Sequence, residues 1–296
     1  MTDHKPLKIA IASGKGGTGK TLVATNLFHT LISNDIKTSL VDCDAEAPNA
    51  KLFFEGKLEK SFAVTQQVPV IDENLCTYCG KCYEYCHYNA IFILPPARVI
   101  KVIEDLCHGC GACTVACKFG AITEKPMPLG EVRRYALEGS QSLVESCMKT
   151  GVFSPVAVIK AGIKEAGNGQ TVIMDAPPGT SCPFIQTVDR ADFVVLVTEP
   201  TPFGLSDLRQ SVETLKRMKK PCGVIVNRTG LGNHALYDFL EQEDIPLLME
   251  IPFERNIAHT YAQGRKLKDL DPAWETRFLN LFEKIILENG NSHHKR

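Results

Sequence analysis

The sequence predicts an α/β fold: a doubly wound, mostly parallel sheet with an inserted small α+β module. Short apolar, β-branched runs alternate with segments whose apolar residues recur at helical spacing, which is typical of a parallel sheet with helices between its strands. Eight of the twelve cysteines fall between Cys76 and Cys117, where this alternation stops. We therefore predict a main domain formed by residues 1–66 and 126–296, and an inserted domain formed by residues 67–125.

The elements of the main domain follow one another in a regular order. The run LKIAIAS predicts the first strand, KTLVATNLFHTLI a helix, and TSLVD the second strand. Beyond the cysteines and a polar, glycine-punctuated return segment, a helix is predicted over 155–166 with proline in its first turn. A last helix over 272–288 carries one apolar face that we expect to pack on the core. Between them, strands are predicted at TVIMD, FVVLV, CGVIVN and LLMEIP, and helices around 204–219, 234–242 and 254–263.

Charge and hydropathy exclude several classes of protein. The chain of 296 residues has 33 basic and 34 acidic side chains, so nothing in its composition favours nucleic acid or an anionic membrane as a partner. The start MTDHKPLKIAIAS lacks a charged-then-apolar leader, and no apolar run approaches the roughly 18 residues that span a bilayer. We expect a soluble cytoplasmic protein with no transmembrane segment and no nucleic-acid partner.

A glycine-rich loop joins the first strand to the first helix. Its sequence GKGGTGKT fits G-x-x-x-x-G-K-[ST] in the strand-to-helix context that this phosphate-binding motif requires. Glycines let backbone N–H groups close around phosphate oxygens, and the helix directs its positive end at the same charge. We expect Lys20 to contact the β- and γ-phosphates and the Thr21 hydroxyl to bind Mg²⁺. The remaining phosphate-binding residues are Gly14, Lys15, Gly16, Gly17, Thr18 and Gly19.

Acidic residues follow two of the predicted strands. Asp175 ends TVIMD and begins DAPPG, where a carboxylate would meet the magnesium ion or its water. Asp42 and Asp44 end the second strand in VDCD, at the same edge of a parallel sheet. From the residues alone, these two acids are either solvated loop residues or part of the catalytic site.

Several of these motifs together resemble one family. KGGTGKT, with its early lysine, resembles the deviant Walker A motif of the MinD-type ATPases, which include partition ATPases, the nitrogenase iron protein and Mrp-type iron–sulfur carriers. VDCD resembles the family's first switch, DAPPG its second, and VNR at 226–228 its adenine-side motif. The similarity covers roughly residues 7–55 and 150–265. It implies a P-loop NTPase fold, ATP as the nucleotide, and a homodimer with ATP at the interface.

The resemblance also implies roles for individual residues. Lys15 would reach across the dimer to the partner subunit's phosphates, so it joins Lys20 as a catalytic residue. Asp44 would orient the attacking water, and Asp42 would lie beside the magnesium and the switch. Asn227 would hydrogen-bond adenine. Two further residues, Pro252 and Phe253, would flank the base.

The cysteines form two copies of one pattern, C-x-x-C-x-x-C-x-x-x-C, offset by 31 residues. The copies resemble a bacterial two-cluster ferredoxin, in which the fourth cysteine of each run binds the other cluster. The usual proline after that cysteine is replaced by His87 and Lys118. Paired zinc sites are the alternative for these thiolates. The resemblance implies two 4Fe–4S clusters, one held by Cys76, Cys79, Cys82 and Cys117, the other by Cys107, Cys110, Cys113 and Cys86.

The four remaining cysteines are isolated in the sequence, and we expect inert thiols there. Of the four, Cys182 is the candidate for a functional thiol, because it lies near a nucleotide motif. The others are Cys43, Cys147 and Cys222.

The combination of modules suggests three functions. The first is an ATP-hydrolysing homodimer that passes electrons through its two clusters to an unidentified partner protein. The second is an iron–sulfur cluster assembly or carrier ATPase with an acceptor protein as partner, and the third is a positioning ATPase whose clusters sense redox state.

Overall fold

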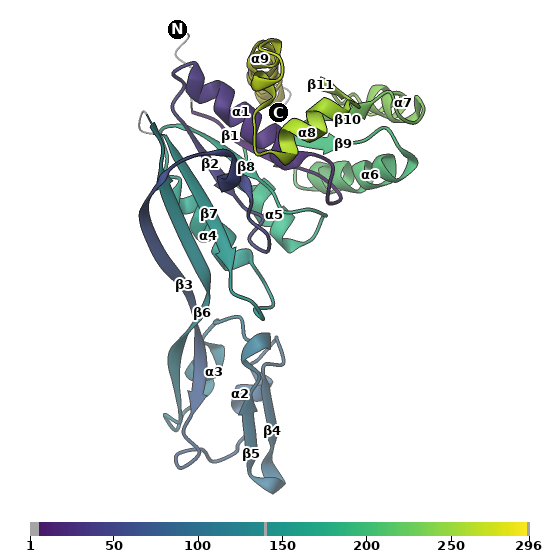
Figure 1. Cartoon of the computed structure of the whole chain (residues 1–296). Helices are drawn as coiled ribbons and strands as arrows, with labels where there is room; N and C mark the ends of the chain where they lie inside the picture. Colours follow the sequence, from purple (N-terminus) through teal and green to yellow (C-terminus); the bar gives the residue numbers. More distant parts are fainter. Residues whose placement is uncertain (1–5, 139–140, 295–296) are drawn as a thin grey trace. The chain divides into compact units, whose positions relative to one another are not determined.

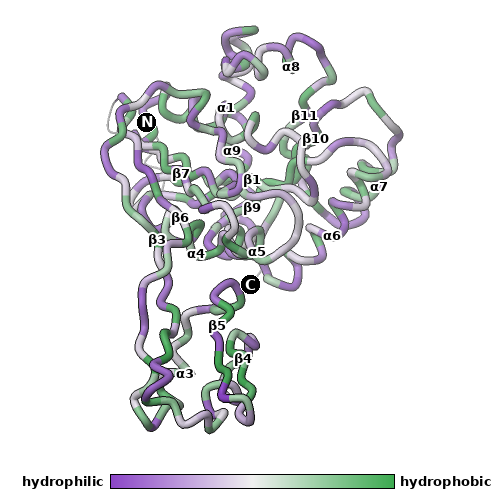
Figure 2. The backbone as a smooth tube through the Cα atoms, turned by 60° about the horizontal axis from the view of Figure 1, so that its bottom comes forward, coloured by the Kyte–Doolittle hydropathy of each residue, from purple (hydrophilic) through white to green (hydrophobic). Residues whose placement is uncertain are grey.

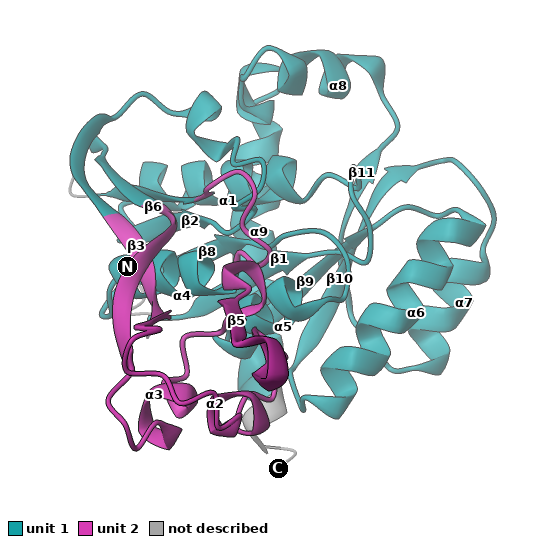
Figure 3. Cartoon of the chain, turned by 90° about the horizontal axis from the view of Figure 1, so that it is seen from below, with its two compact units in different colours: residues 1–62, 132–147, 156–296 teal, residues 63–131, 148–155 magenta. Residues whose placement is uncertain are grey.

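The computed structural model describes residues 6–138 and 141–294, which fall into two compact units (Figure 3). Unit 1 is formed by Met1–Phe62, Val132–Cys147 and Val156–Arg296, and unit 2 by Ala63–Glu131 and Met148–Pro155. Residues 1–5, which begin the segment examined above for a leader, lie outside the described residues. The assignment of residues 67–125 to a ferredoxin-like domain stays a prediction.

Strands and helices alternate along most of unit 1, as the sequence predicts (Figure 1). Short 3₁₀ helices occur at Ala50–Phe53 and Leu267–Asp269. The strands and helices are β1 (Lys8–Ala12), α1 (Lys20–Ser33), β2 (Thr38–Asp42), β7 (Ser142–Met148), α4 (Val156–Glu165), β8 (Thr171–Asp175), α5 (Cys182–Asp189), β9 (Phe193–Thr198), α6 (Pro202–Arg217), β10 (Cys222–Thr229), α7 (Ala235–Gln242), β11 (Leu247–Pro252), α8 (Arg255–Ala262) and α9 (Ala273–His294).

The described residues form one nine-stranded sheet in the order β11-β10-β9-β1-β8-β2-β7-β6-β3, where β3 is Lys57–Ile71 and β6 is Ile122–Ala136. The pairs β10–β11, β9–β10, β1–β9, β1–β8, β2–β8 and β2–β7 are all parallel. The predicted α/β class with a mostly parallel sheet is therefore confirmed. In the register of β2 with β8, Asp42 lies opposite Asp175, so the two acids do meet at one edge of the sheet.

The core of unit 1 lies between the sheet and its helices. Ile9, Ile11 and Ile173 are fully buried in the same cluster as Phe28 of α1 and Phe278 of α9. The apolar face of α9 is buried in this cluster, which explains the apolar stripe in its sequence. Helices α1 and α9 cover one face of the sheet, and α4 and α5 lie on the opposite face (Figure 1). Burial of both faces accounts for the near-continuous apolar runs of the central strands.

Three strands escaped the sequence analysis. β3 alternates mostly between exposed and half-buried residues, and its charged start KLEK reads as a loop. β6 contains Pro126, Pro128 and Gly130, which usually argue against a strand, and β7 lies within the polar, glycine-punctuated return segment, where the sequence predicts no strand. β6 and β3 end the sheet and keep exposed polar side chains, so the apolar pattern that predicts central strands is weak there. β7 is buried, but its polar residues Ser142, Glu145 and Ser146 interrupt the apolar run.

Unit 2 has a small core of its own. β4 (Ile91–Leu94) and β5 (Val99–Val102) form an antiparallel pair, as the runs AIFIL and VIKVI suggest, and both are largely hydrophobic in Figure 2. α2 (Lys81–Glu84) and α3 (Ala112–Ala116) follow Gly80 and Gly111, whose φ angles of 79° and 71° suit glycine. The 3₁₀ turns at Pro95–Ala97 and Glu104–Leu106 complete the unit.

Within the described residues, we find no helix whose length and hydropathy would allow it to cross a membrane.

Candidate functional site

The glycine-rich loop wraps around a buried lysine. Lys20, the first residue of α1, is 7% exposed, and its Nζ donates a hydrogen bond to Ser13 Oγ at 3.0 Å. Ser13 Oγ in turn donates to the backbone oxygen of Lys15 at 2.6 Å. Burial lowers the pKa of Lys20, while the charges of Asp175 and Asp44 oppose this effect. The sequence forms this loop because Gly19 takes φ 102° and leaves no room for a Cβ beside Asn227.

Next to this lysine lies a pair of oxygen donors suited to a divalent cation. Thr21 Oγ1 donates to Asp175 Oδ2 at 2.6 Å, whereas Oδ1 of the same carboxylate is buried without a hydrogen-bond partner in the described part of the chain. Burial, together with the charge of Asp42, raises the pKa of Asp175 to about 8. A carboxylate with a free oxygen beside a threonine hydroxyl fits the hard oxygen ligands that Mg²⁺ prefers.

Asp42 is turned toward its own loop. Its Oδ2 accepts hydrogen bonds from the backbone N–H groups of Asn49 (2.8 Å) and Ala50 (2.9 Å), and its Oδ1 accepts one from Asp44 (3.1 Å). The side chain is fully buried, which raises its pKa to about 6 despite these bonds. In this structure Asp42 therefore fixes the loop that carries Asp44, and its place beside the magnesium stays a prediction.

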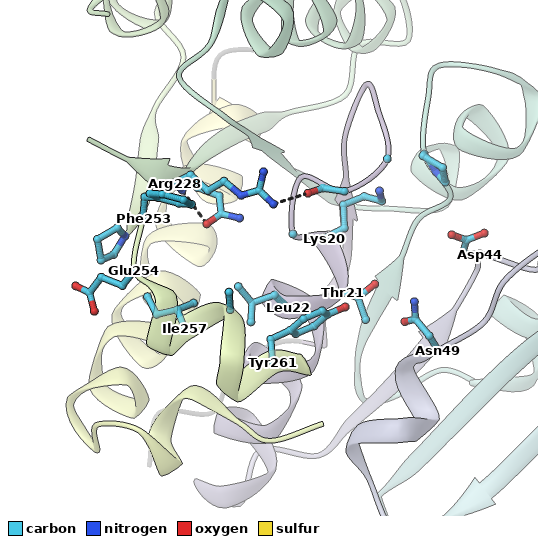
Figure 4. A pocket seen from close by; sticks show the side chains of 17 residues that line it. Lys20, Thr21, Leu22, Asp44, Asn49, Arg228, Phe253, Glu254, Ile257 and Tyr261 are labelled. Atoms are coloured by element: carbon cyan, nitrogen blue, oxygen red, sulfur yellow. Dashed lines mark hydrogen bonds between the residues drawn. The ribbon is translucent and has the colours of Figure 1, made fainter. Parts of the chain in front are cut away.

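Asp44 and Asn49 are brought to the cavity by this loop. Both line a cavity of about 350 Å³ together with Lys20 and Thr21 (Figure 4). Burial raises the pKa of Asp44, and the charge of Lys20 opposes the shift. The ammonium group of Lys20, the hydroxyl of Thr21 and the carboxylate of Asp44 therefore line the same cavity. Its further lining residues are Gly16, Gly17, Gly19, Leu22, Pro178, Asn227, Arg228, Pro252, Phe253, Glu254, Ile257, Ala258 and Tyr261.

Asn227 of β10 also lines this cavity. Its Nδ2 donates a hydrogen bond to the backbone oxygen of Thr18 at 2.7 Å, and its Oδ1 accepts one from the backbone N–H of Arg228 at 2.8 Å. The side chain therefore ties β10 to the glycine-rich loop. Pro252 and Phe253 line the same cavity, so all three residues that the resemblance assigns to the base are brought together.

Lys15 points elsewhere. It is absent from the lining of the cavity described above, and its Nζ lies 3.3 Å from Oε2 of Glu199. The other oxygen of Glu199 lies 2.7 Å from the Arg228 guanidinium, so one nearly buried carboxylate holds two cations. The sequence analysis missed Glu199. It follows the strand FVVLVT, so the rule that identified Asp175 at a strand end would also have found it.

Tyr261 of α8 was missed as well. Figure 4 shows its ring lying beside Leu22 with the hydroxyl directed toward Thr21. Burial raises the pKa of the Tyr261 hydroxyl, and its hydrogen bond with Thr21 opposes the shift. No motif in the sequence marks this tyrosine, because its place depends on how α8 packs against α1.

The eight clustered cysteines separate into two cavities of unit 2. Each cavity takes three cysteines from one run and the fourth from the other, which is the grouping expected for a two-cluster ferredoxin. One cavity is lined by Cys76, Cys79, Cys82 and Cys117, and the other by Cys86, Cys107, Cys110 and Cys113. We call these cavities cluster site 1 and cluster site 2.

The surroundings of the sulfurs fit thiolate ligands. Backbone N–H groups of Tyr78, Ala90 and Gly109 donate to the Sγ atoms of Cys76, Cys86 and Cys107 at 3.3–3.4 Å. Such hydrogen bonds stabilise charged sulfur in iron–sulfur proteins. Within residues 6–138 and 141–294, no three His, Cys, Asp or Glu side chains come close enough together to hold a single metal ion. In a 4Fe–4S cluster, by contrast, each thiolate binds a different iron atom, so the donor set of each cavity fits such a cluster.

The isolated cysteines differ in exposure. Cys43 is fully buried, which raises the pKa of its thiol, whereas Cys182 is exposed at the first turn of α5. Cys147 and Cys222 are half-buried.

The raised pKa of Asp175 predicts a pH-dependent stability. Its folded pKa of about 8 exceeds the ordinary 3.8, so between these values the folded chain binds more protons than the unfolded chain, and stability falls as pH rises. We expect the thermal midpoint of the nucleotide-free protein to fall more from pH 5 to pH 8 than that of Asp175→Asn, by roughly 2 °C or more. Asp238→Asn, at an exposed position of α7, is the control and should behave as wild type. If the thermal midpoints of wild type and Asp175→Asn fall equally from pH 5 to pH 8, Asp175 is not the source of the pH dependence.

The chain is similar to known proteins along most of its length. A family model described as the CobQ/CobB/MinD/ParA nucleotide binding domain matches residues 9–267. An uncharacterized protein of Methanocaldococcus jannaschii is 32% identical over 86% of this chain and 89% of its own length. An iron–sulfur cluster carrier protein of Pyrococcus furiosus is 24% identical over 94% of this chain and 85% of its own.

A solved structure supports the same relationship at the level of the fold. The septum site-determining protein MinD of Pyrococcus horikoshii, complexed with Mg-ADP, superposes with a TM-score of 0.57 at 20% identity, covering 95% of this chain and 96% of that one. The glycine-rich loop, the parallel sheet and the match over residues 9–267 agree: the chain belongs to the CobQ/CobB/MinD/ParA nucleotide-binding family of P-loop ATPases.

Proposed function

We propose that the protein is an ATP-hydrolysing homodimer that passes electrons through two 4Fe–4S clusters to a partner protein, with nucleotide state and cluster state coupled. The observation that carries the proposal is the presence, in one chain, of a phosphate-binding cavity and two cavities lined by four cysteines each. The cytoplasm suits such a chain, because thiols stay reduced there.

The nucleotide cavity supports ATP binding with magnesium. The loop N–H groups and Lys20 would hold the phosphates, and Thr21 with Asp175 would hold Mg²⁺, which neutralises charge on the transferred phosphoryl group. Asp44 lines the same cavity with a raised pKa, which suits a group that orients or deprotonates water.

The position of Lys15 supports a dimer. One lysine of the loop already lines the cavity of its own chain, while Lys15 lies on Glu199 outside that lining. A Lys15 that leaves Glu199 is free to contact phosphates bound by a second copy. Residues that supply positive charge in trans to a phosphoryl-transfer site raise kcat greatly.

The crossed grouping of the cysteines supports electron transfer. Because each cluster site uses both runs, removal of either cluster would release ligands from two segments of the chain. Cys82 and Cys113 are also buried, in one hydrophobic cluster. Both features suit clusters that stay in place while electrons move.

A second candidate is an ATPase that assembles or carries iron–sulfur clusters. The comparisons favour it over electron transfer, since a relative aligned over 94% of this chain is named an iron–sulfur cluster carrier protein. Exposed Cys79 and Cys110, one in each cluster site, would give an acceptor protein access to iron. Under this proposal the clusters are cargo and ATP controls their release.

The trans role of Lys15 predicts a separation of binding from hydrolysis. We expect Lys15→Ala to lower the ATPase kcat by about 10³-fold or more, with the Kd for ATP changed less than about tenfold, since Lys20 remains in the cavity. Lys20→Ala should lower the ATPase kcat and also weaken ATP binding. Lys160→Ala, at an exposed position of α4, should change neither kcat nor the Kd for ATP. Light scattering with ATP should show a dimer for wild type and a monomer for Lys15→Ala. Hydrolysis at the wild-type rate by a monomeric Lys15→Ala protein would refute the dimer.

Coupling predicts that ATP changes the clusters. In anaerobic, iron-loaded protein, Mg-ATP should shift a cluster midpoint potential by roughly 40–130 mV, the equivalent of a coupling of about 1–3 kcal/mol. Electron paramagnetic resonance during a redox titration measures this shift and counts the clusters. Lys20→Ala, which should lose ATP binding, is the control and should show no shift.

A cluster-transfer assay distinguishes the two candidates. Iron-loaded protein is mixed with an apo-ferredoxin, and the cluster gained by the acceptor is followed with and without Mg-ATP. ATP-stimulated transfer with loss of iron from the donor favours the carrier, whereas reduction of an acceptor with full retention of iron favours electron transfer. Nucleotide-dependent partner binding that responds to cluster oxidation, with neither activity, would favour the redox-sensing ATPase.

A further inference from the structure

The two cluster sites have matching walls. Most residues that line cluster site 1 have a counterpart 31 positions away in the lining of cluster site 2. The counterpart lies 31 positions later for residues of the first cysteine run and 31 positions earlier for residues of the second. Ala121 and Ile122, for example, correspond to Ala90 and Ile91. Differences between the two sites can therefore be found position by position.

One matched position changes from apolar to acidic. Ile93 of β4 lines cluster site 1, and Glu124 of β6 takes the same place in cluster site 2. Glu124 Oε1 accepts a hydrogen bond from Thr114 Oγ1 at 2.8 Å, and it lies 3.4 Å from where a Cβ on Gly111 would stand. The carboxylate is thus held against the wall of cluster site 2 by a neutral hydroxyl.

The carboxylate of Glu124 lies in the same cavity lining as the ligand cysteines Cys107 and Cys110. A negative charge beside a bound cluster disfavours the addition of an electron to that cluster, because the added charge has the same sign as the carboxylate.

The other charged groups in the two linings do not reverse this difference. Lys81 lines cluster site 1 where Ala112 lines cluster site 2, and its Nζ lies 2.6 Å from the carboxylate of Glu84. His108 of cluster site 2 is stacked on Tyr88, with ring centroids 3.8 Å apart. A cation next to cluster site 1 and an anion next to cluster site 2 shift the two potentials in the same relative sense.

We propose that Glu124 sets the order of the two cluster potentials, making the cluster held by Cys86, Cys107, Cys110 and Cys113 the harder one to reduce. A single electron then rests on the cluster of cluster site 1. The inference rests on the proposed function, since it requires both clusters to be present.

The test uses the full-length, iron-loaded protein and its two midpoint potentials, followed by electron paramagnetic resonance. Glu124→Gln keeps the shape and the hydrogen bond to Thr114 but removes the charge. It should raise the lower midpoint alone, by about three- to tenfold in the reduction equilibrium constant, or roughly 30–60 mV at ~59 mV per tenfold. Ile93→Glu, the matched variant of the other site, should lower the higher midpoint alone. Lys149→Gln, which removes an exposed charge of unit 2 outside both linings, is the control and should leave both midpoints unchanged.

The outcomes separate this inference from the proposed function. Iron analysis and spin counting come first, and a protein without two clusters would overturn both. If two clusters are present, an unchanged lower midpoint in Glu124→Gln, or a shift of the higher one, overturns the role of Glu124 and leaves the proposed function standing. Far-UV circular dichroism and unchanged iron content show that each variant is folded and loaded.

Discussion

The buried ammonium of Lys20 is the interaction on which the nucleotide half of this molecule depends. Lys20 is only 7% exposed, and a buried ammonium group is stable only with polar or charged partners. These partners are the Ser13 hydroxyl, which accepts a hydrogen bond, and the negative charges of Asp175 and Asp44. Parallel strands make this possible, because their carboxyl ends meet at one edge of the sheet. Burial disfavours the charged forms of Asp44 and Asp175 at that edge and raises the pKa values of both. The site therefore favours a ligand that brings phosphate charge together with a divalent cation.

The ion pairs around Glu199 place a second constraint on the same loop. Lys15 and Arg228 both reach this carboxylate, and Arg228 follows Asn227, which itself holds the loop through Thr18. The early lysine of the motif is thus paired with a carboxylate just after β9, outside the lining of the cavity that contains Lys20. A nearly buried carboxylate shared by two cations orients both of them, and any movement of Lys15 changes the surroundings of Arg228.

The sequence predicts the parts of the structure that depend on local pattern. The central strands, the glycine-rich loop and the helices around 204–219, 234–242 and 254–263 follow from apolar periodicity and turn chemistry, and the structure contains all of them. The outer strands β3 and β6 were missed because polar side chains and prolines hide their alternation. Tyr261 and the bond between Lys15 and Glu199 depend on the packing of segments far apart in the chain, which no local pattern reports. The cysteines line two cavities in the crossed grouping that the duplicated motif predicts, whereas their binding of 4Fe–4S clusters stays a prediction.

The neighbouring strands β6 and β3 end the nine-stranded sheet, and each extends from unit 1 into unit 2 within one continuous strand. A hydrogen-bonded ladder cannot slide by one residue without turning every side chain to the opposite face. The register of β3 against β6 is therefore kept as long as the ladder between them stays paired. A one-residue insertion or deletion in either strand would consequently turn the side chains beyond it to the opposite face of the ladder.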